Sequence, residues 1–273
     1  MKEDFNTKEV HFKAMLISQD AFVLGVRGKE EEAIPLYEQA FELERQAALS
    51  LLNVENVEPT RSILFRSAAA LAMKCHKYRD SEKMIGLGLS GNPPQYVLTE
   101  LRELFDEVRK RSRSKKAQQE AAKKAVLRNG KKTSIFIISK VQPTITPNFN
   151  MEEVHDKAML ISQDAFVLVA YGKEDQAIPL YEQAFELERQ AAMSLLNRDD
   201  LEPTRSILFR SAAALAKKCY KYQDAEKMIG FGLAGNPPED VAEELRELFD
   251  AVKKLQQPKK TPAKATKKAI VMA

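Results

Sequence analysis

The chain is built from two nearly identical halves, and no other feature of the sequence constrains its fold as strongly. Residues 11–110 align with residues 155–254 without a gap at a constant offset of 144, and 77 of the 100 aligned positions are identical. Because each copy of a repeated sequence adopts the same supersecondary unit, we expect one small domain to occur twice. The predicted organisation is a helical domain at 5–110, a basic linker at 111–148, a second helical domain at 149–256 and a basic disordered tail at 257–273.

Each copy is predicted to be all-α. Helix-forming residues are abundant, the 273 residues include only 10 glycines, and apolar residues recur at helical spacing. A capping box formed by Asn6 and Glu9 indicates a helix start, Gly28 ends a helix, and Gly91 followed by Pro93 ends another. In the first copy we expect helices near 14–26, 30–52, 59–74, 78–89 and 95–108, the last of them a cap with a polar outer face.

This spacing gives two antiparallel helix pairs per copy, and the second pair resembles a tetratricopeptide repeat. In that motif, small residues stand where the helices cross and larger residues fill the space between them. The matching positions are Phe65, Ala69, Ala72, Tyr78, Ser81, Ile85, Gly88 and Pro93, and in the second copy Phe209, Ala213, Ala216, Tyr222, Ala225, Ile229, Gly232 and Pro237. The first pair departs from the motif, with Glu30 in place of the usual tyrosine and Arg45 in place of the terminal proline. The segment 58–72 also resembles a stretch of short bacterial proteins of this type.

The resemblance implies a tetratricopeptide-like α-solenoid that recognises a protein or peptide in its concave groove, without catalysis or a cofactor. In this family the groove is lined mainly by the first helix of each pair. The partner-binding candidates are therefore Gln19, Arg61, Phe65 and Ala68, with Gln163, Arg205, Phe209 and Ala212 in the second copy. Near-identical halves also suit a twofold contact, so the two copies are candidates for an intramolecular pseudo-dimer.

Charge is distributed unevenly along the chain. Residues 109–132 carry a net charge of +10 and residues 253–268 a net charge of +7, so the rest of a chain with an overall charge of +4 carries −13. One interpretation is that the basic segments bind the phosphate backbone of a nucleic acid without reading its sequence. The residues concerned are Arg111, Arg113, Lys115, Lys116, Lys259, Lys260 and Lys264. The other interpretation is a solubilising segment, or one that folds back on the acidic helices.

Few residues offer catalytic or metal-binding chemistry. The histidines are expected at the surface, and they are His11, His76 and His155. Lysines near Cys75 and Cys219 can lower a thiol pKa, although a buried packing role is the more common one for such cysteines. The glycines within 86–91 match the dinucleotide-binding fingerprint as a string, but they lie at the end of a helix and not between a strand and a helix. We therefore expect no enzyme activity, metal, membrane span or secretory leader, and a cytoplasmic location.

Overall fold

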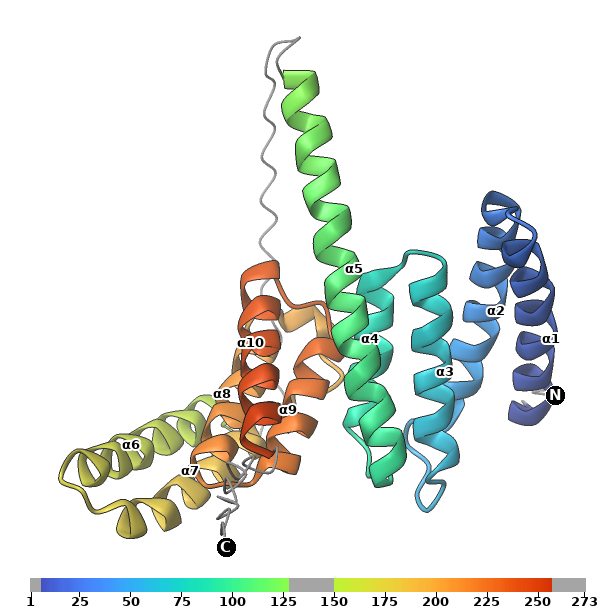
Figure 1. Ribbon diagram of the computed structural model, residues 1–273. Coiled ribbons are helices and arrows are strands. Elements are labelled where there is room, and N and C mark those ends of the chain that lie inside the picture. The colour runs from blue at the N-terminus through green and yellow to red at the C-terminus, as the bar shows by residue number, and fades with distance from the viewer. Residues whose placement is uncertain (1–5, 128–149, 257–273) are drawn as a thin grey trace, which may run out of the picture.

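The computed structural model describes residues 6–127 and 150–256, and within these ranges it contains helices but no strand. The first copy consists of α1 (Thr7–Val26), α2 (Glu30–Ser50), α3 (Thr60–Lys74), α4 (Tyr78–Leu89) and α5 (Gln95–Leu127). The second consists of α6 (Met151–Ala170), α7 (Glu174–Ser194), the 3-10 turn η1 (Asp199–Leu201), α8 (Thr204–Lys218), α9 (Tyr222–Ala234) and α10 (Glu239–Gln256). The predicted all-α fold of antiparallel helical hairpins in two copies is confirmed (Figure 1).

Local signals explain where the first hairpin begins and turns. The side-chain oxygen of Asn6 accepts a hydrogen bond from the backbone N–H of Glu9 at 3.3 Å, which is the predicted cap. Because the capped turn runs directly into the apolar segment, α1 starts at Thr7 and is longer than the predicted helix. Gly28 has a φ of +75°, a conformation that favours glycine, and α2 begins two residues later.

The core of each copy lies between the second hairpin and its neighbouring helices. Phe41, Phe65, Ile85 and Leu101 come from α2, α3, α4 and α5, and their side chains are buried. A Cβ atom on Gly88 would lie 3.1 Å from the Leu101 side chain and 3.3 Å from Cβ of Phe65. Glycine at this position therefore lets α4 approach both α3 and α5, as the repeat motif predicts.

The fifth helix differs from its prediction in length and in surroundings. It continues to Leu127, through part of the segment expected as linker, since the alanine, glutamine and lysine residues there favour helix. The predicted role of this helix as a cap with a polar outer face is wrong, because its outer face contacts the second copy. There, Phe105 packs edge to face on Phe249 of α10, with ring centroids 4.7 Å apart. In the second copy, the helix equivalent to α5 is α10.

The two copies contact each other through equivalent helices, with α4 packed against α9 (Figure 1). Gly86 and Gly230 are equivalent residues, and they meet where the two helices cross. A Cβ atom on Gly86 would lie 2.5 Å from the carbonyl oxygen of Gly230, and a Cβ atom on Gly230 would clash with Gly86 in the same way. Gly86 and Gly230 therefore allow the backbones of α4 and α9 to touch. The repeat motif, which explains Gly88, does not predict this role.

Candidate partner-binding surfaces

The predicted groove residues of α3 and α8 lie in the hydrophobic core. The side chains of Phe65 and Ala68 have no exposed surface, and those of Phe209 and Ala212 are buried to the same extent. Phe65 and Phe209 occupy packing positions of the motif, and Ala68 and Ala212 are buried beside them on the same helices. A partner can therefore reach these four residues only if the helices separate.

The predicted glutamines lie elsewhere, on the outer side of the first helix of each copy. Gln19 and Gln163 are exposed, whereas Ala14 and Ala21 form the buried side of α1. The structure thus does not bring Gln19 together with the α3 residues proposed as its neighbours. Both glutamines remain accessible to a partner.

Arg61 and Arg205 border a hollow of about 630 Å³ between the two copies. The Arg61 guanidinium donates a hydrogen bond to the carbonyl oxygen of Leu87 at 2.9 Å and contacts Glu58 at 3.4 Å, as the i, i+3 spacing predicts. Arg205 makes the equivalent contacts in the second copy. Burial lowers the pKa of Arg61, more than Glu58 raises it. Both arginines therefore connect the start of one helix to the end of the next, and their role as partner-binding residues stays a prediction.

A buried glutamate and an exposed histidine form a pair that the sequence does not reveal. Nδ1 of His11 lies 2.8 Å from a carboxylate oxygen of Glu44, on the neighbouring helix α2. The Glu44 side chain has no exposed surface, while that of His11 is 38% exposed. The prediction that His11 is at the surface is therefore correct in part, but its acidic partner is Glu44 and not the nearby Glu9. His155 and Glu188 repeat the pair at 2.8 Å.

This pair continues as a row of polar side chains across the copy. Burial raises the pKa of Glu44, more than His11, Ser67 and Arg66 lower it. On the far side, Nε of Arg66 on α3 lies 3.3 Å from a carboxylate oxygen of Glu100 on α5. We call this set the polar row: His11, Glu44, Arg66 and Glu100, with His155, Glu188, Arg210 and Glu244 in the second copy. Its His, Arg and outer Glu side chains are partly exposed, so each copy presents the same polar surface around one buried carboxylate.

The raised pKa of the buried glutamates predicts a pH dependence of stability. A carboxyl whose folded-state pKa is raised binds its proton more tightly in the folded chain, so the free energy of unfolding falls as pH rises above about 4.5. In the double variant Glu44→Gln with Glu188→Gln, the free energy of unfolding should fall less as pH rises. Urea unfolding across pH 4–8 measures this free energy. Glu42→Gln with Glu186→Gln, exposed residues on the same helices, should retain the wild-type slope. An unchanged slope in the first variant would contradict the assignment.

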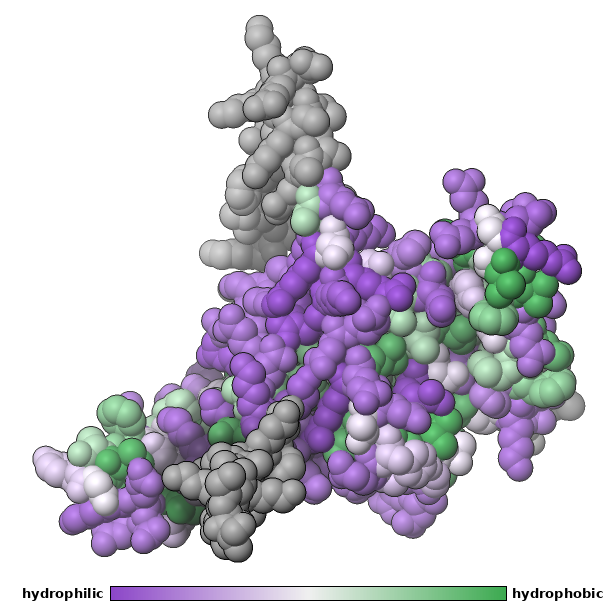
Figure 2. Space-filling view, in the orientation of Figure 1, coloured by the Kyte–Doolittle hydropathy of each residue, from purple (hydrophilic) through white to green (hydrophobic). Residues whose placement is uncertain are grey.

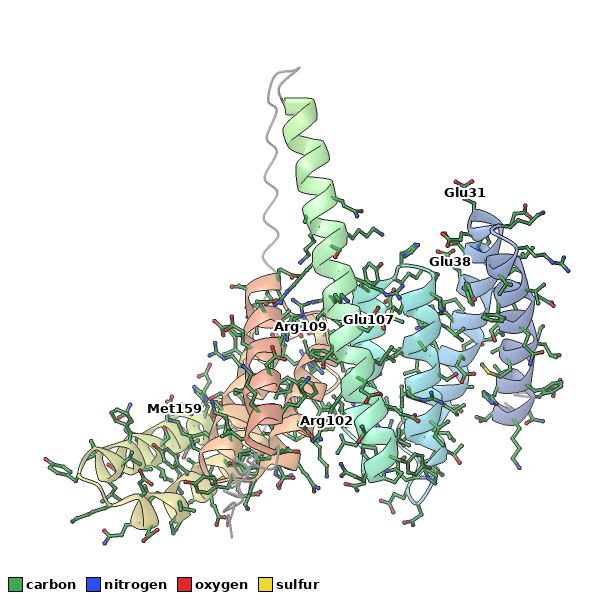
Figure 3. The ribbon with its side chains drawn as sticks, in the orientation of Figure 1. Glu31, Glu38, Arg102, Glu107, Arg109 and Met159 are labelled. Carbon is green, nitrogen blue, oxygen red and sulfur yellow. The ribbon has the colours of Figure 1, made fainter. Side chains whose placement is uncertain are left out.

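Two reciprocal ion pairs connect the copies, and Figure 3 labels one of their members, Arg102 on α5. Arg102 on α5 binds Glu226 on α9 through two hydrogen bonds of 2.9 and 2.7 Å. Arg246 on α10, the equivalent of Arg102, binds Glu82 on α4 through two hydrogen bonds of 2.9 and 2.6 Å. Burial raises the pKa of Glu226, more than Arg102 lowers it. All four side chains are largely buried, so this contact is an interface of buried, paired charges.

The basic residues after the fifth predicted helix meet acidic residues of the same chain. Arg113 donates a hydrogen bond of 2.9 Å to Glu243, and Lys116 one of 2.5 Å to Glu239, both on α10. Arg111 pairs with Glu107 one turn earlier, and Lys115 lies over the Tyr78 ring. The first copy has Thr99 and Gln95 where the second has Glu243 and Glu239, so these acids are specific to the helix that faces α5. This segment thus folds back on acidic helices, the second of the two interpretations above.

The basic residues of the C-terminal tail proposed to contact nucleic acid lie outside the described residues. They are Lys259, Lys260 and Lys264.

The two cysteines are packing residues. Cys75 and Cys219 are buried, and burial raises the pKa of both thiols more than Lys77 and Lys221 lower it. The suggestion that neighbouring lysines activate these thiols is therefore wrong. We expect both to react with a disulfide reagent at least about tenfold more slowly in the native chain than in guanidinium, because reaction requires local opening. Equal rates in the two conditions would contradict their burial.

No helix within the described ranges is long and apolar enough to cross a bilayer. Among the same residues, no group of three or more histidine, cysteine or acidic side chains is placed to hold a metal ion.

The chain matches no protein-family model, and no curated protein matches it. Among solved structures, it is similar to a Podosopora anserina putative kinesin light chain with nearly identical TPR-like repeats, at 13% identity and a TM-score of 0.26. The alignment covers 94% of this chain and 100% of that one. A second crystal structure, of a variant of the same protein, gives 14% identity, coverage of 89% and 97%, and a TM-score of 0.26. At this TM-score the likeness transfers no property to the chain.

Proposed function

We propose that the chain is a non-catalytic scaffold that binds protein or peptide partners on two equivalent surfaces. The observation that carries this proposal is the polar row, whose four residue types are the same in both copies. Burying Glu44 and Glu188 has a desolvation cost, which is offset in part by the contact of each carboxylate with a histidine that reaches solvent. Partly exposed His, Arg and Glu side chains held in fixed positions suit hydrogen bonding to a partner's backbone and charged groups.

We further propose that the two copies form an intramolecular pseudo-dimer. Its support is that the contacts between copies come in equivalent pairs: Gly86 with Gly230, Phe105 with Phe249, and the two Arg–Glu pairs. Asp106 and Asp250 extend the pattern, since they pair with Lys253 and Arg109 respectively. Such an arrangement holds the two polar rows at a fixed separation, which favours a partner that is itself dimeric or has two binding sites.

The proposal is tested by affinity capture from the native lysate with the full chain as bait. The test bait carries Arg66→Gln and Arg210→Gln, which remove one member of each polar row. The control bait carries Arg45→Gln and Arg189→Gln, an arginine pair on α2 and α7 of similar exposure that contacts glutamates of its own helix. Each bait is used at moderate salt, at high salt and after nuclease treatment.

A protein retained at high salt and after nuclease by the wild-type and control baits, but lost from the test bait, is the expected result. Equal retention by all three baits would show that the polar row is not the binding surface. Retention of nucleic acid alone, released by high salt, would favour the phosphate-binding alternative and overturn the scaffold proposal.

A further inference from the structure

Exposed apolar side chains are concentrated on the first helix of each copy. Among the large apolar residues that the described ranges expose, most belong to α1, or to α6 and its C-cap: Phe12, Leu16, Phe22, Val23 and Val26, and Leu160, Phe166, Val167, Val169 and Tyr171. Phe22 is 60% exposed and Phe166 is 62% exposed. Figure 2 shows apolar surface at both ends of the molecule, over the regions of these helices. Contiguous apolar surface of this kind marks an interaction site.

Both helices lie at an end of the helical array, as Figure 1 shows. α1 packs on α2 and α6 packs on α7, each through a side with fully buried alanines, which are Ala14 and Ala21 in α1 and Ala158 and Ala165 in α6. In a stack of helical hairpins, each hairpin covers the exposed face of the one before it. The outer faces of α1 and α6 are therefore placed to take a further helix on each end.

The two ends differ in charge, although the copies are nearly identical. In α1 the positions i, i+4 and i+8 of one helical row are Lys8, Phe12 and Leu16, and all three are exposed. The equivalent row of α6 is Glu152, Asp156 and Leu160, also exposed. Over the whole N-terminal half, the exposed charged residues of α1 are Lys8, Glu9 and Lys13, and those of α6 are Glu152, Glu153, Asp156 and Lys157. This half of α1 is thus weakly basic, with a net charge of +1, and that of α6 is acidic, with a net charge of −2. Their C-terminal halves share an exposed valine and phenylalanine.

We propose that the chain assembles end to end, with α1 of one molecule packed in parallel against α6 of a second molecule. In this orientation the apolar C-terminal halves face each other, with Phe22 beside the second molecule's equivalent apolar surface. The N-terminal halves then bring Lys8 near Glu152 and Asp156 of α6, which is electrostatically favourable.

The alternative contacts between identical ends are less favourable. A twofold contact between two α1 helices is either parallel or antiparallel. The parallel contact places Lys8 of one helix beside Lys8 of the other, and the antiparallel contact lays Lys8 of each over the region of Val23 and Val26 in the other. Like charges side by side repel, and covering a charge with apolar groups is costly. In the antiparallel contact, Asp20 is the one acidic residue that the C-terminal half of α1 exposes near Lys8. The same holds for Glu152 in a contact between two α6 helices. A contact between α1 and α6 uses two different surfaces, so it leaves an open end and can continue beyond a dimer.

The test uses two full-length variants, each with one end blocked. Phe22→Asp blocks α1, and Phe166→Asp blocks α6. Both side chains are exposed, so circular dichroism and thermal unfolding should match the wild type. Molar mass is measured by light scattering or sedimentation over a series of concentrations, for the wild type, for each variant and for their equimolar mixture. Tyr96→Asp, at an exposed apolar residue of α5, serves as the control.

We expect the wild type and the Tyr96→Asp control to rise with concentration beyond twice the 30.8 kDa of one chain. Each blocked variant alone should remain a monomer, and the mixture should stop at a dimer, because it contains one intact α1 and one intact α6 that can meet. Dimerisation of a single blocked variant by itself would indicate contacts between identical ends and overturn the proposal. A wild-type chain that stays monomeric at every concentration would also overturn it.

Discussion

Replacing Gly86 with valine is expected to separate the two copies or to strain the contact between them severely. The smallest added atom, Cβ, would lie 2.5 Å from the carbonyl oxygen of Gly230 and 3.3 Å from the backbone nitrogen of Ala234. These are backbone atoms of a helix, which cannot rotate away as a side chain can. Overpacking a well-packed core typically costs about 1–3 kcal/mol, and we expect a value at or above the upper end of that range.

The readouts are the radius of gyration from small-angle scattering and the midpoint of thermal unfolding. A larger radius with retained helix content would show that the copies have moved apart. Gly25→Ala is the matched control, because no atom lies within 4 Å of the position of its Cβ. It should leave the radius unchanged and raise helix stability by up to about 1 kcal/mol. An unchanged radius and midpoint for Gly86→Val would contradict the close crossing of α4 and α9.

Arg102→Ala is expected to have the other large effect, lowering the free energy of unfolding by about 3–5 kcal/mol. The side chain of Glu226 is 2% exposed, and without Arg102 its carboxylate is left buried with no bidentate partner. Urea unfolding monitored by circular dichroism measures the loss. Arg45→Ala, which removes one member of an exposed ion pair within α2, should cost less than about 1 kcal/mol.

A second substitution separates loss of charge pairing from loss of packing. Adding Glu226→Gln to Arg102→Ala removes the unpaired charge, so part of the lost stability should return. Arg246→Ala should be at least as damaging as Arg102→Ala, because Arg246 contacts three carboxylates: those of Glu82, Glu239 and Glu243. Equal stability of Arg102→Ala and the wild type would show that the two copies do not depend on this pair.

Those parts of the fold that depend on residues close together in the sequence could be predicted from it. The bounds of α4, Tyr78–Leu89, match the prediction because apolar spacing, glycine and proline all act within a few residues of the helix. The capping box at Asn6 and the turn at Gly28 are local in the same sense. The two-copy organisation was also evident, since it requires only comparison of the chain with itself.

The contacts between elements could not be predicted in this way. Arg102 and Asp106 alternate with apolar residues on α5, and this pattern suits a solvent-facing cap as well as it suits a charged interface. Their partners, Glu226 and Lys253, lie more than 100 residues away in the sequence. His11 likewise has Glu9 close in sequence, but its partner is on the next helix. Only the fold decides which acid each cation meets.

The candidate groove residues show a different limit. The repeat motif itself assigns Phe65 to packing, so its burial is consistent with the motif and removes it from the accessible surface. Of the two arginines of α3, only Arg61 is among the predicted groove residues, although nothing in the sequence tells which of them points inward. The structure places Arg61 against the end of α4 and Arg66 in the polar row.

The most direct test of the account is whether the two copies stay together without a covalent connection. A protease site is introduced within residues 128–149 of the full chain, and complete cleavage is verified under denaturing conditions. At a concentration low enough for the uncleaved chain to be a single molecule of 30.8 kDa, we expect the native cleaved protein to elute at that same mass, held by the contacts of α4 and α5 with α9 and α10. Two species of about half that mass would show that the copies are independent domains, and would contradict the pseudo-dimer and the fixed separation of its two surfaces.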